Sequence, residues 1–181
     1  RHARLVIEAL TAGKHVFVEK PLAMKSGELD EIKATVESFG NGKSPLLLTG
    51  FNRRFSPFAL KIRELTRDRK GPMMLDYRMN AGYIPPDHWV HGDEGGGRNI
   101  GEACHIYDLF TYLVDARMVA VSAKAVRPAT GWYSARDNFS ASVSFEDGSV
   151  AVLTYTALGS NDYPKEHLDV FCDGRTFDMD N

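Results

Sequence analysis

The residue types best suited to chemistry lie just after a run of glycines. Residues 95–97 are all glycine, and Glu102, His105 and Asp108 follow within three helical turns. An imidazole titrates near pH 6.5 in model compounds, so His105 is suited to take a proton from an alcohol or return one to a carbonyl oxygen. Asp108 could orient that imidazole. A core histidine among solvated acids is the alternative, but the glycine run and Lys20 favour a catalytic role.

The angular spacing of these residues predicts how a helix would present them. A helix from about Ile100 to Val114 turns about 100° per residue, which places Gly101, His105 and Asp108 on one stripe. Glu102 is then offset by roughly 60° on the adjacent face.

Glu19-Lys20-Pro21 forms a second candidate site, because it ends an apolar strand where an open α/β sheet collects its ligands. Proline keeps Lys20 out of helical geometry, and an X-Pro bond tolerates the cis form. The ammonium could then bind a substrate oxygen and stabilise negative charge. A solvated lysine at a strand end is the alternative.

Two further groups could contribute to a site. Arg53 and Arg54 could pair with an acidic ligand, with carboxylates between domains, or in a structural salt bridge. Tyr83, His88 and Trp89 lie in a diproline loop that could shape a pocket for a polar ring such as a sugar, or pack as a lid without ligand contact.

Composition excludes several classes of function. The chain has 181 residues, 43% of them hydrophobic, with a formal net charge of -2, which indicates a globular protein and disfavours nucleic acid as a partner. No apolar run has the roughly 20 residues of a membrane span. Cys104 and Cys172 lie far apart without zinc-type spacing, so we expect no metal site, and reduced thiols in a cytoplasmic protein; a disulfide is the minor alternative.

The first fifty residues alternate between helix and strand. The pattern predicts helices over 2–12 and after a Ser26 cap, with strands over 15–19 and 46–50. This alternation is typical of a doubly wound α/β domain with a parallel sheet. We therefore assign residues 1–50 to the end of such a domain.

Residues 51–181 have a different pattern, that of an α+β domain. A helix over 57–67 and a strand over 73–80 precede a long loop, and the helix from Ile100 follows it. Strands are predicted over 119–126, 138–145, 149–156 and 166–171, in a large, mostly antiparallel sheet with one face on the core. Asp173-Gly174 predicts a turn, after which we expect the chain to stop before another full strand. Both ends suggest a fragment.

These motifs together resemble the Gfo/Idh/MocA family of nicotinamide-dependent oxidoreductases. The resemblance rests on residues 19–21, 50–57 and 95–108, in matching order and spacing across nearly the entire chain. It implies the tail of a Rossmann domain followed by a substrate-binding and oligomerisation domain with an open sheet. No Gly-x-Gly-x-x-Gly run is present, so the main dinucleotide-binding turn is not in this chain.

The resemblance also assigns roles to residues. Lys20 matches the lysine that contacts substrate and nicotinamide, and His105 matches the histidine that acts as acid and base. It further implies cofactor contacts by Glu19, Pro21 and Arg54. The predicted substrate contacts are Glu102, Asp108, Tyr83, His88 and Trp89. The family often has an aspartate four residues before the histidine, but this chain has Gly101 there, and Glu102 is adjacent.

By this resemblance we expect an NAD- or NADP-dependent dehydrogenase acting on a sugar, cyclitol or similar polyol, as a homo-oligomer formed through the C-terminal sheet. The alternatives are an NAD-dependent glycosidase or lyase of the same family, or a catalytically silent binding and assembly module. We expect these 181 residues alone to be inactive.

Overall fold

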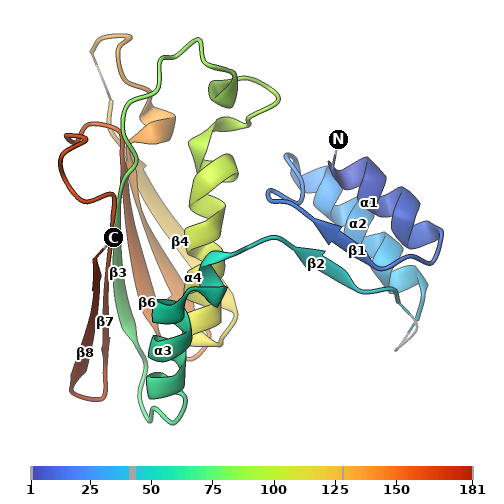
Figure 1. The fold of residues 1–181 in the computed structure, drawn as a ribbon, viewed down its shortest axis with the longest axis horizontal. Coiled ribbons are helices and arrows are strands. Elements are labelled where there is room, and N and C mark those ends of the chain that lie inside the picture. The colour runs from blue at the N-terminus through green and yellow to red at the C-terminus, as the bar shows by residue number, and fades with distance from the viewer. Residues whose placement is uncertain (1, 41–43, 128, 181) are drawn as a thin grey trace. The chain divides into compact units, whose positions relative to one another are not determined.

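The computed structural model describes residues 2–40, 44–127 and 129–180 (Figure 1). They form two compact units, and the chain passes from the first to the second after Phe51. Each unit has its own hydrophobic core. The two functional domains predicted from the sequence, 1–50 and 51–181, stay a prediction.

The first unit alternates between helix and strand, as predicted. Its elements are α1 (His2–Thr11), β1 (Val16–Val18), α2 (Ser26–Ser38) and β2 (Leu47–Thr49). The two strands pair in parallel with Val16 opposite Leu47. Ala3, Val6, Leu10 and Ile32 of the helices form the core against them.

The start of α2 corrects one prediction. Lys25 occupies the N-cap position, and Ser26, predicted as the cap, is the first residue of the helix. The carboxylate of Glu28 instead accepts hydrogen bonds from the backbone N–H of Met24, at 2.8 Å, and of Lys25, at 3.2 Å. This acid reaches backwards to donors that the helix leaves unpaired, so the cap needs no serine hydroxyl.

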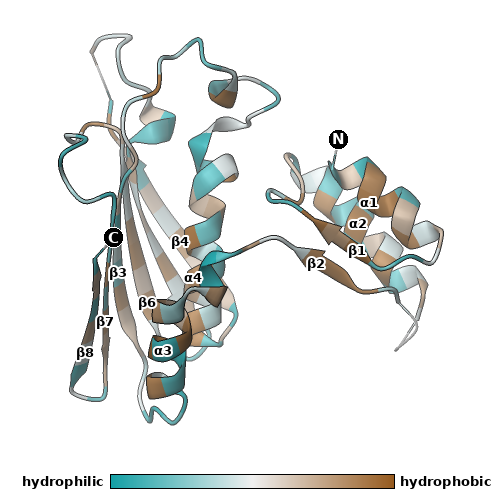
Figure 2. Ribbon diagram, in the orientation of Figure 1, coloured by the Kyte–Doolittle hydropathy of each residue, from teal (hydrophilic) through white to brown (hydrophobic). Residues whose placement is uncertain are grey.

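Phe17 and Leu48 pair across the two strands and are exposed, on the face opposite Val16 and Leu47. Figure 2 shows both strands as strongly hydrophobic. Strands of parallel sheets are typically apolar on both faces, which fits this pattern.

The second unit contains a six-stranded sheet of order β4-β5-β6-β3-β7-β8. Only β3 and β6 pair in parallel, so the prediction of a mostly antiparallel sheet is confirmed. The strands are β3 (Met74–Asn80), β4 (Met118–Ala125), β5 (Phe139–Phe145), β6 (Val150–Thr156), β7 (Glu166–Cys172) and β8 (Arg175–Asp180).

The prediction that the chain stops before a further strand is wrong. Residues 175–180 form β8, which pairs antiparallel with β7 along its whole length. Asp173 and Gly174 both have positive φ in the tight turn between these strands. Backbone pairing with β7 therefore creates a strand where the sequence, rich in aspartate, has little strand propensity of its own.

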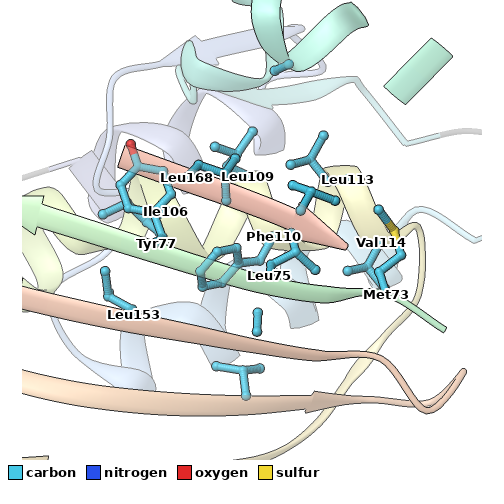
Figure 3. Close-up of a cluster of buried hydrophobic side chains, with 14 of the residues drawn as sticks. Met73, Leu75, Tyr77, Ile106, Leu109, Phe110, Leu113, Val114, Leu153 and Leu168 are labelled. Carbon is cyan, nitrogen blue, oxygen red and sulfur yellow. The ribbon is translucent and has the colours of Figure 1, made fainter. Parts of the chain in front are cut away.

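Two helices, α3 (Pro57–Thr66) and α4 (Cys104–Val114), cover one face of this sheet (Figure 1). Ser56 caps α3 by accepting a hydrogen bond from the N–H of Ala59 at 3.2 Å. Tyr77 of β3 and Phe110 of α4 meet edge to face in the core (Figure 3). Within the described residues of the second unit, no helix lies over the sheet's other face.

Among the described residues, no helix is both long enough and apolar enough to cross a membrane. Neither Cys104 nor Cys172 takes part in a disulfide, and Cys172 packs in the core of the second unit.

Candidate active site

Lys20 lies immediately beyond β1, in a turn tied to the first helix. The Lys20–Pro21 peptide is cis, and the Pro21 carbonyl lies 2.9 Å from Nδ1 of His2. A side chain added at Gly50, which follows β2, would come within 3.2 Å of the Glu19 carboxylate. Glu19-Lys20-Pro21 thus follows the carboxyl end of β1, next to Gly50 at the carboxyl end of β2. This is the sheet edge where α/β proteins bind ligands.

His105 is the second residue of α4 and is buried in the second unit, with 7% of its surface exposed. The glycines before it are required by the backbone. Gly96 and Gly97 have φ of 67° and 80°, and a Cβ at Gly95 would lie 2.3 Å from the carbonyl oxygen of Val90. Only glycine allows this close approach and these conformations, so the run determines how the chain enters the helix.

The first turn of the predicted helix is not α-helical, which corrects the angular prediction. Residues Asn99–Ala103 form a π-helical turn (η3), and α4 begins only at Cys104. A π-turn spaces its hydrogen bonds five residues apart, so 100° per residue does not hold before residue 104. The predicted stripe linking Gly101 to His105 therefore lacks its geometric basis. Single π-turns occur frequently at functional sites.

Asp108 and Arg54 bind each other. Nε of Arg54 donates to Oδ2 of Asp108 at 2.9 Å, and its Nη2 donates to Oδ1. The hydrogen bonds that Arg54 donates to Asp108 raise the pKa of Arg54 despite partial burial. A structural salt bridge is one of the interpretations that the sequence leaves open for Arg54, and the structure shows such a bridge. The cofactor role of Arg54 and the substrate role of Asp108 stay predictions.

Arg53 makes the same kind of contact with Glu166. Its Nε donates to Oε2 at 3.3 Å and its Nη2 to Oε1, while the hydroxyl of Tyr77 donates to Oε2. Burial favours the protonated acid, but the hydrogen bonds from Arg53 and Tyr77 outweigh it and lower the pKa of Glu166. Both arginines therefore bind carboxylates within their own unit.

Glu102 lies at the centre of a polar cluster, defined here as the Glu102 cluster: Glu102, Arg98, Tyr155 and Lys165. Oε2 accepts from Nη2 of Arg98 at 3.1 Å and from the hydroxyl of Tyr155. Oε1 lies 3.3 Å from Nζ of Lys165. Burial opposes ionisation, but these donors and cations lower the pKa of Glu102, so the carboxylate is charged.

Arg98 is a buried member of this cluster, with 4% of its surface exposed. Its guanidinium also donates to the carbonyl oxygens of Gly82, at 2.5 Å, and Ala81, at 2.6 Å. Its i,i+4 spacing from Glu102 could have revealed it in the sequence. No comparable signal exists for Tyr155 and Lys165, which lie more than fifty residues away along the chain.

The predicted aromatic loop makes both distant and local contacts among the described residues. Tyr83 meets Tyr133 edge to face, with ring centroids 5.7 Å apart. Nδ1 of His88 accepts from the N–H of Val90 at 3.3 Å and caps the short 3-10 helix η2 (Trp89–His91). Trp89 is exposed. Substrate contacts by Tyr83, His88 and Trp89 stay predictions.

A buried acid that the sequence analysis missed lies in another loop. Asp137, in the 3-10 helix η4 (Ala135–Asp137), lies 3.6 Å from Nε2 of His91. Burial raises its pKa, although His91 and Arg98 act in the opposite direction. The contact links the loop after β3 to the loop before β5.

A cavity of about 650 Å³ opens beside the glycine run, a size typical of small-molecule sites. It is mostly apolar and does not include His105 or Glu102. Its lining residues are Gly96, Gly97, Asn99, Ile100, Tyr107, Val121, Ala123, Ala125, Ala135, Arg136, Phe139 and Ala141.

On the open sheet face, His167 lies among aspartates. Nδ1 is 2.6 Å from Asp180 and Nε2 is 3.0 Å from Asp169. Hydrogen bonds to these carboxylates raise the pKa of His167. A ring nitrogen of His167 and carboxylate oxygens of Asp178 and Asp180, all possible metal ligands, lie within 4.8 Å of one another. With both ring nitrogens facing carboxylates, hydrogen bonding within the group accounts for the arrangement.

Comparison with known proteins assigns the family. The family model for the GFO/IDH/MocA C-terminal domain matches residues 71–178, and the model for the oxidoreductase family NAD-binding Rossmann fold matches residues 1–43. The chain therefore belongs to the Gfo/Idh/MocA family, as its motifs predicted, and the expected Rossmann tail and C-terminal domain are confirmed.

The relatives are oxidoreductases. The chain is 29% identical over 157 residues to the oxidoreductase YrbE of Bacillus subtilis, covering 84% of this chain and 44% of that protein. It is 32% identical over 124 residues to a scyllo-inositol 2-dehydrogenase (NAD(+)) of the same organism, covering 67% of this chain and 34% of that protein. This chain thus spans less than half the length of either relative.

Solved structures share the fold. Myo-inositol dehydrogenase from Lactobacillus casei, in complex with NAD(H) and myo-inositol, has a TM-score of 0.75 at 18% identity, covering 99% of this chain and 52% of that one. At this identity the likeness concerns the fold.

Proposed function

We propose that the whole protein transfers a hydride between a nicotinamide cofactor and a hydroxyl-bearing carbon of a sugar, cyclitol or similar polyol. The observation that carries the proposal is the glycine-run and π-turn entry to a helix that begins with a buried histidine, in a chain of the Gfo/Idh/MocA family. Relatives named as inositol dehydrogenases support a polyol substrate.

NAD is the proposed cofactor, because the matched Rossmann model is described as NAD-binding and several structural neighbours are complexes with NAD or NADH. The residues of this chain fit such a group, since Glu19, Lys20 and Pro21 follow a parallel strand at its carboxyl end. When bound, the nicotinamide supplies the hydride chemistry.

The chain's own residues supply the proton transfer and the binding of the substrate oxygen. His105 takes the hydroxyl proton as the alcohol is oxidised and returns it in the reverse direction. Lys20 donates a hydrogen bond to a substrate oxygen and stabilises developing negative charge. Glu102 accepts a hydrogen bond from a further substrate hydroxyl.

His105→Asn in the full-length protein tests this proposal. Turnover should fall by about 10²–10⁴-fold, the usual contribution of a positioned acid or base, while the affinity for NADH stays unchanged. Exposed His15→Asn is the matched control and should keep its activity. Normal turnover in the His105 variant would contradict the assignment.

A catalytically silent module is the second candidate, favoured by one observation, the absence of a side chain at Gly101. It predicts that the full-length protein binds neither NADH nor NADPH. Fluorescence transfer from tryptophan to the reduced nicotinamide separates the two functions, since saturable binding contradicts the silent module.

We also propose that the protein forms a homo-oligomer through the open face of its sheet. Met74 and Phe171 are exposed there, among short hydroxyl side chains from β5 and β6. Such a face suits packing against a second sheet.

A further inference from the structure

The carboxylate position typical of the family is sterically restricted in this chain. A Cβ at Gly101 would lie 3.2 Å from the carbonyl oxygen of Gly95. Gly95 itself has little freedom to move away, because its own Cα lies against the backbone of Val90. A side chain at 101 would therefore have to displace the glycine run, and the nearest carboxylate along the chain is that of Glu102.

The two oxygens of Glu102 are in different situations. Oε2 receives hydrogen bonds from Arg98 and Tyr155, both on its buried side. Oε1 pairs with Lys165, whose side chain is 54% exposed, whereas that of Glu102 is 24% exposed. A carboxylate oxygen accepts about two hydrogen bonds and an ammonium donates three. Oε1 and Nζ therefore retain hydrogen-bonding capacity on the solvent side.

Lys165 is positioned by a loop that is fastened to the end of β3. The N–H of Asn80 donates to the carbonyl of Lys165 at 2.7 Å. The Asn80 side chain donates to the carbonyl of Ser160 at 2.7 Å, and Gly159 packs closely against it. Since Arg98 is bound to the two residues after Asn80, the same strand end orients both cations of the cluster.

We propose that Glu102 and Lys165 together bind two adjacent hydroxyls of the substrate, one donating to Oε1 and the other accepting from Nζ. This proposal rests on the dehydrogenase function and adds Lys165 to the residues that bind its substrate, which it specifies as a vicinal diol. Lys165 is then a specificity-determining residue that no sequence motif indicated.

The test uses the full-length protein with NAD, and myo-inositol and cyclohexanol as probes. In Lys165→Met and Glu102→Gln the KM for myo-inositol should rise on the order of 10-fold or more, since each variant loses a hydrogen bond to a charged group. We expect kcat and the NADH affinity to change little, and Lys165→Arg to recover part of the loss. Wild-type protein should use cyclohexanol, which lacks a second hydroxyl, poorly.

Lys61→Met is the matched control, because Lys61 is an exposed lysine of α3 whose ammonium also pairs with a glutamate, Glu64. Lys165→Met should melt like the wild type, since the backbone bond from Asn80 does not need the Lys165 side chain. Glu102→Gln should melt at a lower temperature, because it leaves the buried Arg98 without its partner charge, so its KM is measured well below that temperature. Unchanged KM in both variants, or cyclohexanol used as well as myo-inositol, would overturn the diol proposal alone. Failure of the wild type to bind NADH would overturn the dehydrogenase function together with it.

Discussion

At the scale of single residues, Glu166 illustrates how burial and pairing determine a charge. Its side chain is almost fully enclosed, yet two donors from η1 (Arg53–Phe55) and β3 keep it ionised. Breaking a buried pair leaves the partner charge uncompensated, which costs more than the pair itself contributes.

Glu166→Gln should therefore destabilise the second unit by about 3 kcal/mol, within the range for removing one partner of a buried pair. Urea unfolding followed by circular dichroism measures this. Glu37→Gln, in the exposed Lys33–Glu37 pair, should change stability by less than about 0.5 kcal/mol. Similar losses in the two variants would contradict the importance of burial.

The same pair predicts a pH dependence. Because the pKa of Glu166 in the folded state is below its ordinary value of 4.5, its charge stabilises the fold above that pH and the contribution is lost as the pH falls through the lowered pKa. The stability difference between wild type and Glu166→Gln should thus be constant near neutrality and shrink in acid. A difference that grows in acid would contradict this sign.

At the scale of elements, the glycine run controls the entry into α4. The close approach of Gly95 to the Val90 backbone lies just before the π-turn that contains Glu102 and leads to His105. A backbone contact of this kind cannot be relieved by rotating a side chain.

Gly95→Ala should destabilise the second unit by about 1–3 kcal/mol, as overpacking does, and lower turnover of the full-length protein. Gly131→Ala is the control in the same unit, since a Cβ there meets nothing within 4 Å. Thermal unfolding of both variants provides the comparison. Equal melting temperatures would show that the close approach of Gly95 to Val90 does not limit which side chain the fold tolerates at position 95.

At the scale of the whole molecule, the open sheet face is the surface for which we propose self-association. Val152 lies on this face, between Ser142 of β5 and Asp76 of β3 in register. Its neighbours along the strand, Ala151 and Leu153, point into the core instead.

Val152→Arg should convert the oligomer to monomers, because paired copies would bury an unpaired guanidinium. Sedimentation velocity measures the change, with circular dichroism as a check of folding. Leu60→Arg, on the exposed side of α3, should keep the wild-type assembly. A monomeric wild type would contradict the proposed oligomer directly.

The sequence alone determined the order and type of most elements, because hydrophobic periodicity and turn residues are local signals. The helix–strand alternation of residues 2–49 and the strands at β5 and β6 were predictable in this way. So was the family, since its motifs are short segments recognised by order and spacing. Local signals failed at the Ser26 cap and at β8, where Glu28 and the neighbouring strand decided the outcome.

Only the tertiary structure decided what the charged residues bind. Arg54 and Asp108 are 54 positions apart, Arg53 and Glu166 are 113 apart, and no spacing rule connects them. The π-turn before α4, and the close approach of Gly95 to the Val90 backbone that precedes it, cannot be found by counting 100° per residue. Lys165 joins Glu102 because its loop is bound to Asn80. Such partners are brought together by packing of distant segments, so the sequence could suggest reactive residues but not their electrostatic environment.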